Sequence, residues 1–200
     1  NEDTYAEEPS GYALVKPDNY KIGQMLAERL IQDDEEQLEN KKIGVILGKA
    51  ETEESVDRIA GLKDGLEGSG CEIFWEYNYA RGNQNTSEII ASKKQVDYLV
   101  ILDNWALEEV GEAAEENKYH GAKIYGVGSS EKAIVLLDNQ NIECLVVPDD
   151  YETGYMSMNE IAKKLRHSFY KMNSCETEVR IINKEDLYSK DLERFLYSYE

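Results

Sequence analysis

The segment KIGVILGKAETEESVDRIAGLKDGLEGSGCEIFWEY, residues 42–77, decides the fold. It opens with the apolar run 43–47, which is too short to cross a membrane and too continuous for a strand with one solvated face. Such a run is typical of a central strand in a parallel sheet, because helices cover both faces of that sheet. A polar loop, apolar residues at helical spacing, two glycines and a second strand at 72–77 follow. The segment is therefore a βαβ unit.

The rest of the chain alternates strands and helices in the same way. This alternation predicts an α/β fold, with a parallel sheet flanked by helices on both faces and right-handed crossovers. Besides those in the opening unit, we expect strands at 12–16, 98–102, 123–127, 142–147 and 178–182. Helices are expected after Asp18 or Asn19, at 87–94, after Asp103-Asn104, from Ser129 or Ser130 to 137, and at 151–170 and 184–197.

Composition excludes several classes of partner. The 200 residues carry a net charge of −19, and nucleic acid or an anionic membrane surface would require a basic patch. A hydrophobic fraction of 41% is enough for a globular core. The three cysteines, at 71, 144 and 175, show no paired spacing and are expected to be buried thiols.

Motifs for catalysis or cofactor binding are missing from the sequence. The loop 48–54 follows a strand as a phosphate loop would, but it has few glycines and several glutamates that would repel phosphate. His120 and His167 have no neighbours at metal-ligand spacing and are expected at the surface. We therefore expect no enzyme, no metal and no cofactor.

Several polar and aromatic residues fall where parallel strands end, which is where ligands bind in such sheets. Asp103 and Asn104 follow a buried strand, and either capping of the next helix or ligand binding would explain them. Arg58 lies in the first turns of a helix, against the helix dipole; taken alone it suggests an ordinary surface arginine. Tyr77 and Tyr79 leave a strand toward the same edge, as stacking aromatics in a carbohydrate site do, although tyrosines also coat ordinary surfaces.

Six segments, taken in order, resemble the type 1 periplasmic binding proteins, which include sugar-binding proteins of ABC transporters and the effector domains of lac-repressor-type regulators. They are VKPDNYKIGQMLAERL, KKIGVILG followed by DRIAGLKDGLEGSG, VDYLVILDN, AKIYGVGSS, VVPDDYETGYMSMNEIAKKL and VRIINKEDL. Each segment is weakly specific alone, but six in the right order cover nearly the whole chain.

The resemblance implies a division of the chain, because family members have two α/β lobes joined by three crossings. This chain matches only the second half of such a protein. Residues 1–17 would be a remnant strand of the first lobe with its hinge, and 18–147 would form the second lobe. Residues 148–175 would cross over and add a helix that packs on the absent lobe, and 176–200 would return.

The resemblance also implies ligand-binding residues. Arg58 matches the family's sugar-binding arginine, Tyr77 or Tyr79 its stacking aromatic, and Asp103 or Asn104 its polar pair. Two positions depart from the pattern: Gly128-Ser129 stands where an aspartate is common, leaving Ser129 as the polar group there, and Pro148 replaces a frequent glutamine.

The function implied by the resemblance is that of a non-catalytic, extracytoplasmic sugar-type solute-binding protein, in the periplasm or as a cell-surface lipoprotein. It would close around a small ligand and deliver it to ABC-transporter membrane subunits. A cytoplasmic lac-repressor-type regulator domain, or a sensor or scaffold that has lost sugar binding, are the alternatives. The apolar face of helix 151–170 would lack its lobe partner and is expected to pair with a second copy of the chain.

Overall fold

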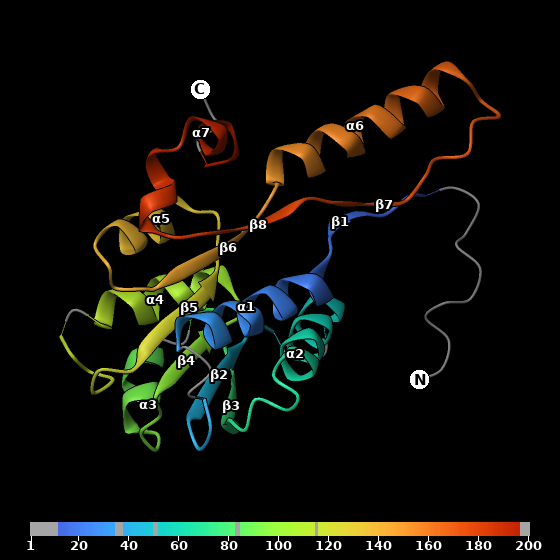
Figure 1. Cartoon of the computed structure of the whole chain (residues 1–200). Helices are drawn as coiled ribbons and strands as arrows, with labels where there is room; N and C mark the ends of the chain where they lie inside the picture. The colour runs from blue at the N-terminus through green and yellow to red at the C-terminus, as the bar shows by residue number, and fades with distance from the viewer. Residues whose placement is uncertain (1–11, 35–37, 50–51, 83–84, 115, 197–200) are drawn as a thin grey trace. The chain divides into compact units, whose positions relative to one another are not determined.

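The computed structural model of the chain (Figure 1) describes residues 12–34, 38–49, 52–82, 85–114 and 116–196. Its main sheet has six strands in the order β3-β2-β4-β5-β6-β8. Each adjacent pair from β3 to β6 is parallel. The strands are β2 (Lys42–Leu47), β3 (Glu72–Asn78), β4 (Tyr98–Ile101), β5 (Lys123–Val127), β6 (Cys144–Pro148) and β8 (Val179–Ile182). The predicted α/β class and parallel sheet are confirmed.

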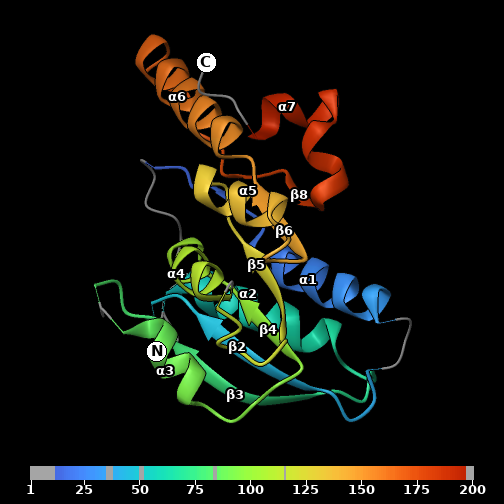
Figure 2. The same ribbon diagram turned by 90° about the vertical axis from the view of Figure 1, so that its left-hand side faces the viewer.

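Helices cover both faces of this sheet. In Figures 1 and 2, α1 (Asn19–Asp33) and α2 (Glu53–Gly65) lie on one side, and α3 (Thr86–Ser92), α4 (Asn104–Ala114) and α5 (Glu131–Asp138) lie on the other. This arrangement follows from the strand order. The chain moves from β2 outward to β3 through α2 and then turns back past β2 to β4, so right-handed crossovers place the later helices on the opposite face.

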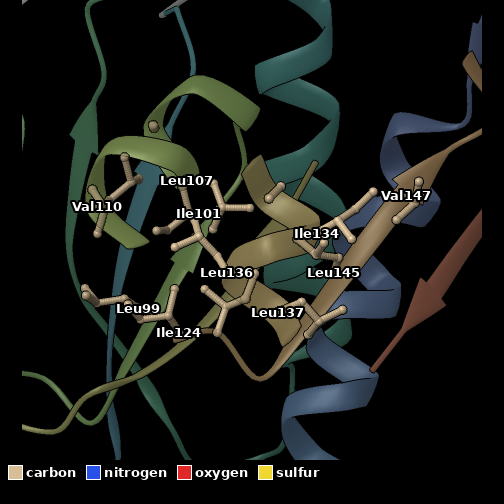
Figure 3. Close-up of a cluster of buried hydrophobic side chains, with 14 of the residues drawn as sticks. Leu99, Ile101, Leu107, Val110, Ile124, Ile134, Leu136, Leu137, Leu145 and Val147 are labelled. Atoms are coloured by element: carbon tan, nitrogen blue, oxygen red, sulfur yellow. The ribbon is translucent and has the colours of Figure 1, made fainter. Parts of the chain in front are cut away.

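The larger apolar cluster fills the layer between the sheet and α3, α4 and α5. Figure 3 shows its centre, where side chains of β4, β5 and β6 meet those of α4 and α5. Nearly all of these side chains are buried, which explains why the central strands read as continuous apolar runs. Residues labelled there include Leu99, Ile101, Leu107, Ile124, Leu136 and Leu145.

Helix α2 packs differently from the predicted apolar stripe. Val56, expected to face inward, is 54% exposed, whereas Gly61 and Leu62 are buried. A Cβ added at Gly61 would lie 1.9 Å from the backbone oxygen of Tyr20, and one at Gly23 would lie 2.1 Å from that of Arg58. The helices α1 and α2 therefore touch backbone to backbone, and glycine is required because a side chain would separate them.

The chain divides into two compact units, residues 1–18 with 148–179 and residues 19–147 with 180–200. In the first unit, β1 (Val15–Pro17) pairs in parallel with β7 (Cys175–Thr177), and α6 runs from Asp150 to Arg166. The predicted helix 151–170 therefore ends four residues early. In the second unit, the expected terminal helix is two pieces, the 3₁₀ helix η1 (Lys184–Tyr188) and α7 (Lys190–Leu196).

Other sequence expectations can be compared directly. His120 and His167 are exposed as predicted, but of the three free cysteines only Cys144 is buried. The expectations for residues 1–11 and for the middle of the acidic run, 35–37, lie outside the described residues. Across the described helices, none combines the length and apolar character needed to cross a membrane.

Candidate functional site at the carboxyl edge of the sheet

The ends of β2 and β4 and the start of α2 meet at the carboxyl edge of the sheet. Thr52 begins α2 by accepting a hydrogen bond from the backbone N–H of Ser55, at 3.3 Å. A Cβ placed on Gly48 would lie 3.0 Å from Asp103 Oδ2 and 3.2 Å from Ser55 Oγ. Three polar segments therefore converge here, and the absence of a side chain at Gly48 allows their approach.

Arg58 is the most deeply buried cation of this edge, at 5% exposure. Its Nε donates to Asn19 Oδ1 at 3.0 Å, its Nη1 donates to the carbonyl oxygen of Leu102 at 2.8 Å, and its Nη2 lies 2.6 Å from Glu54 Oε1. The ordinary surface arginine suggested by its position alone is therefore wrong. Glu54, one turn earlier, compensates for placing a cation near the start of a helix.

Asp103 and Asn104 have different roles. Asp103 Oδ1 accepts the backbone N–H of Ala106 at 2.9 Å and so caps α4, which confirms the capping interpretation for this residue. Asn104 Oδ1 accepts the backbone N–H groups of Ser129 at 3.2 Å and Ser130 at 3.4 Å. Asn104 therefore joins α4 to the start of α5.

Gly128 owes its identity to the same carboxamide. A Cβ at Gly128 would lie 2.5 Å from Asn104 Oδ1 and 3.1 Å from the Cβ of Ala133. Ser130 then caps α5, because its Oγ accepts the backbone N–H of Ala133 at 3.1 Å. In this arrangement Asn104 fills the space in which an aspartate side chain at position 128 would begin.

The two candidate stacking tyrosines lie in different surroundings. Tyr79 is buried, and burial together with the nearby carboxylates of Glu109 and Asp103 raises its pKa. The Tyr77 ring is half-buried and lies 5.3 Å from Lys93 Nζ, which also lies 5.1 Å from the Trp75 ring. Neither tyrosine ring forms an open platform beside Asp103.

Sequence reasoning missed an aromatic residue at this edge. Trp105 lies in the first turn of α4 and is 47% exposed, and Arg81 Cζ lies 3.8 Å from the centre of its ring. Its position directly after Asp103-Asn104 is a signal that could have been read. Asn19, the partner of Arg58 Nε, was considered only as a helix cap, because its contact spans 39 residues.

A separate hollow of about 230 Å³ lies between α5 and η1. Its lining is Glu131, Ile134, Val135, Asp138, Leu187 and Tyr188. Asp138 already accepts a hydrogen bond from the hydroxyl of Tyr188 at 3.0 Å, and the hollow is smaller than a usual ligand pocket. The carboxyl edge is therefore the better candidate.

The edge combines carboxylates, an amide, arginines and an indole face. Carboxylates and arginines together pair with the hydroxyl groups of a small neutral ligand more readily than with an anion, which the acidic groups would repel. In the part of the chain that is described, no group of three or more His, Cys, Asp or Glu side chains is placed to hold a metal ion.

Comparisons with known proteins agree with this fold. No curated protein matches the chain. A carbohydrate-transporter solute-binding protein from Agrobacterium radiobacter, in complex with D-arabinose, superposes with a TM-score of 0.77 at 19% identity over 92% of this chain and 65% of its own. GanP, a glucose-galactose binding protein from Geobacillus stearothermophilus, gives 0.72 at 21% identity over 88% and 64%.

An ABC-transporter solute-binding protein from Bacillus halodurans with bound myo-inositol gives a TM-score of 0.76 at 14% identity, over 87% of this chain and 61% of its own. The chain thus spans less than two thirds of the length of these proteins. Residues 1–168 also match the family described as periplasmic binding protein domain. Because that match covers most of the 200 residues, the chain belongs to the periplasmic binding protein domain family.

Proposed function

We propose that the chain is the ligand-binding lobe of a non-catalytic, extracytoplasmic solute-binding protein that delivers a sugar or similar polyol to ABC-transporter membrane subunits. Residues 19–147 and 180–200 would form this lobe, and the smaller unit would belong to the crossings and to a first lobe. The ligand would be enclosed when the two lobes close about the hinge.

The observation that carries the proposal is the buried guanidinium of Arg58. Its contacts with Asn19, Glu54 and the Leu102 carbonyl fix its orientation at the edge where a parallel sheet binds ligands. A buried, oriented arginine is costly unless all its donors are used, and a planar fork suits recognition of neighbouring oxygens. Exposed Glu54 would give up its position to a ligand hydroxyl more easily than Asn19 or Leu102, because they are buried.

The proposed ligand contacts extend to the rest of the edge. Asp103, through Oδ2, and Ser129 would bind hydroxyl groups, and Asn104 would hold the two segments at a fixed spacing. Tyr77 and Tyr79 remain candidates for supporting the site, with Tyr79 acting from the core. Solved proteins of the same fold bind D-arabinose and myo-inositol, which supports a polyhydroxylated ligand.

A second candidate is a sensor or scaffold that keeps the fold without binding sugar. Gly128 favours it, because Asn104 occupies the space of a side chain at that position, and Pro148 is buried at the end of β6 without a polar side chain. Both features remove hydrogen-bonding groups on which a sugar site depends.

Nuclear magnetic resonance of the ¹⁵N-labelled chain with D-arabinose, D-galactose and myo-inositol tests the proposal. We expect millimolar binding, because only one side of the site is present, with amide shifts at Gly48, Ser55, Asp103 and Ser129. Arg58→Lys keeps the charge but loses the fork and should weaken binding about tenfold or more.

Lys132→Ala provides the control, because Lys132 forms an exposed ion pair with Glu112, at 2.7 Å, outside this edge. Shifts confined to other surfaces, or unchanged binding by Arg58→Lys, would refute the site. Failure of a longer protein that contains both lobes to bind any of these polyols would favour the sensor or scaffold instead.

A further inference from the structure

Helix α6 has its apolar and polar faces reversed relative to its own unit. Residues spaced by three or four positions share a helix face. Thr153, Glu160 and Lys164 form the inner face: Thr153 Oγ1 lies 2.9 Å from Thr177 Oγ1, Glu160 Oε2 accepts the backbone N–H of Asn173 at 2.8 Å, and Lys164 Nζ donates to the carbonyl oxygen of Tyr170 at 2.9 Å. The helix is thus attached to its unit through polar contacts.

The opposite face carries exposed apolar side chains, which we call the α6 stripe: Tyr151, Tyr155, Met158, Ile161 and Leu165. Met158 is 65% exposed and Leu165 83% exposed. The rings of Tyr151 and Tyr155 stack on each other, with centroids 6.4 Å apart. A surface helix normally turns such a stripe toward a core, so the α6 stripe is a surface for a partner. Figure 2 shows that α6 is one continuous helix along this length.

Charge identifies the partner. The helix has Asp150 and Glu152 in its first turn and Lys163, Lys164 and Arg166 in its last turn. With Glu160, its three acidic and three basic residues cancel, whereas the whole chain carries −19. Two copies of so acidic a chain repel each other over most of their surfaces, and α6 is a place where they can meet without that repulsion.

The distribution of these charges also sets the orientation. A helix with an acidic start and a basic end complements itself when a second copy runs in the opposite direction. Glu152 and Arg166 lie on the same flank of the α6 stripe, and an antiparallel pair related by a two-fold axis brings the flank of one copy against the same flank of the other. A parallel pair would instead place like charges together.

We propose that α6 is a homodimer interface in which two copies pack antiparallel through the α6 stripe, with Met158 beside the two-fold axis. Tyr151 of one copy then lies near Leu165 of the other, and Glu152 near Arg166. Five side chains from each copy, at roughly 100 Å² each, bury on the order of 1,000 Å², which suits a weak, reversible dimer.

The association is tested by sedimentation velocity of the 200-residue chain from about 1 to 500 µM, the range of a weak dimer. We expect a concentration-dependent dimer, and Leu165→Lys should raise its dissociation constant by about tenfold or more. Val135→Lys is the matched control, because Val135 is also an exposed aliphatic residue but lies on α5. Met158→Glu repeats the test at a second site, with circular dichroism to establish that both variants fold.

Disulfide trapping tests the orientation, in a background where Cys71 and Cys175 are replaced by serine. Antiparallel packing predicts that Met158→Cys links to itself and that Tyr151→Cys links to Leu165→Cys when the two variants are mixed. Efficient self-linking of Tyr151→Cys would overturn the orientation. A monomer throughout the concentration range, or a dimer unaffected by Leu165→Lys and Met158→Glu, would overturn the interface.

Discussion

Arg58 is a buried cation with three oxygen acceptors, so its contribution to folding can be measured without any ligand. Arg58→Ala leaves Asn19 and the Leu102 carbonyl without their donor and should lower the free energy of unfolding by about 3–5 kcal/mol. Glu54→Ala should cost less than about 1 kcal/mol, because Glu54 is exposed. Urea denaturation of both variants checks this. Equal, small losses would show that burial of the guanidinium contributes little.

Gly128 and Asn104 should behave as a coupled pair. In Gly128→Ala the new methyl group displaces the Asn104 carboxamide, and the Ser129 and Ser130 N–H groups lose their acceptor, at a cost of about 1–3 kcal/mol. Adding Asn104→Ala should then cost much less than it does in the wild-type background. A double-mutant cycle from urea midpoints measures the coupling. Simple additivity would contradict the steric explanation.

The same residues show what a sequence reveals about the site and what it hides. Arg58, Asp103 and Asn104 could be named because each occupies a recognisable place after a strand or at a helix start. Their partners could not, since Asn19 lies 39 residues from Arg58 and Ser129 lies 25 residues from Asn104. Tyr79 was expected near an edge but is buried, because the end of a strand does not reveal which face a side chain packs against.

At the scale of elements, strands were predicted better than helix faces. A fully buried strand leaves a continuous apolar run, as in 43–47, and its position follows directly. Helix α2 misled because its contact with α1 runs through Gly23 and Gly61, and glycines add nothing to an apolar pattern. The end of α6 at Arg166 was missed for a related reason, since polar contacts from Glu160 fix the chain that follows.

Glu160 connects α6 to residues 170–173, and this connection should depend on pH. The Lys163 ammonium, followed by the Asn173 N–H, lowers the pKa of Glu160 from 4.5 to about 2. A folded-state pKa below the unfolded value means that the stabilisation is complete above about pH 4.5 and is lost as pH falls toward 2.

Hydrogen exchange at the Asn173 amide measures this loss, with Glu160→Gln as the pH-independent reference. Asn173 should be protected at neutral pH in the wild-type chain and should approach the Glu160→Gln rate in acid. Protection that stays constant from pH 6 to 2 would assign no role to the Glu160 carboxylate.

For the whole molecule, the excess of acidic groups is the dominant electrostatic property. A net charge of −19 destabilises the compact state through self-repulsion, and salt screens that repulsion over a Debye length of about 10 Å at 0.1 M. The melting temperature should therefore rise between low and moderate sodium chloride concentrations. Sodium sulfate at equal ionic strength separates screening from ion-specific effects, and a flat or falling melting temperature would contradict the prediction.

The stack of Arg81 on Trp105 has an optical consequence. The chain contains two tryptophans, and only Trp105 lies at the carboxyl edge, whereas the ring of Trp75 lies over Gly44 and its Nε1 donates to the carbonyl of Lys94. Indole emission depends on contact with water and with a nearby guanidinium. A molecule arriving at this edge would change the colour and intensity of Trp105 emission, while Trp75 would supply a steady background. The protein thus contains its own fluorescent indicator of occupancy, and Trp75→Phe would make that signal its sole indole emission.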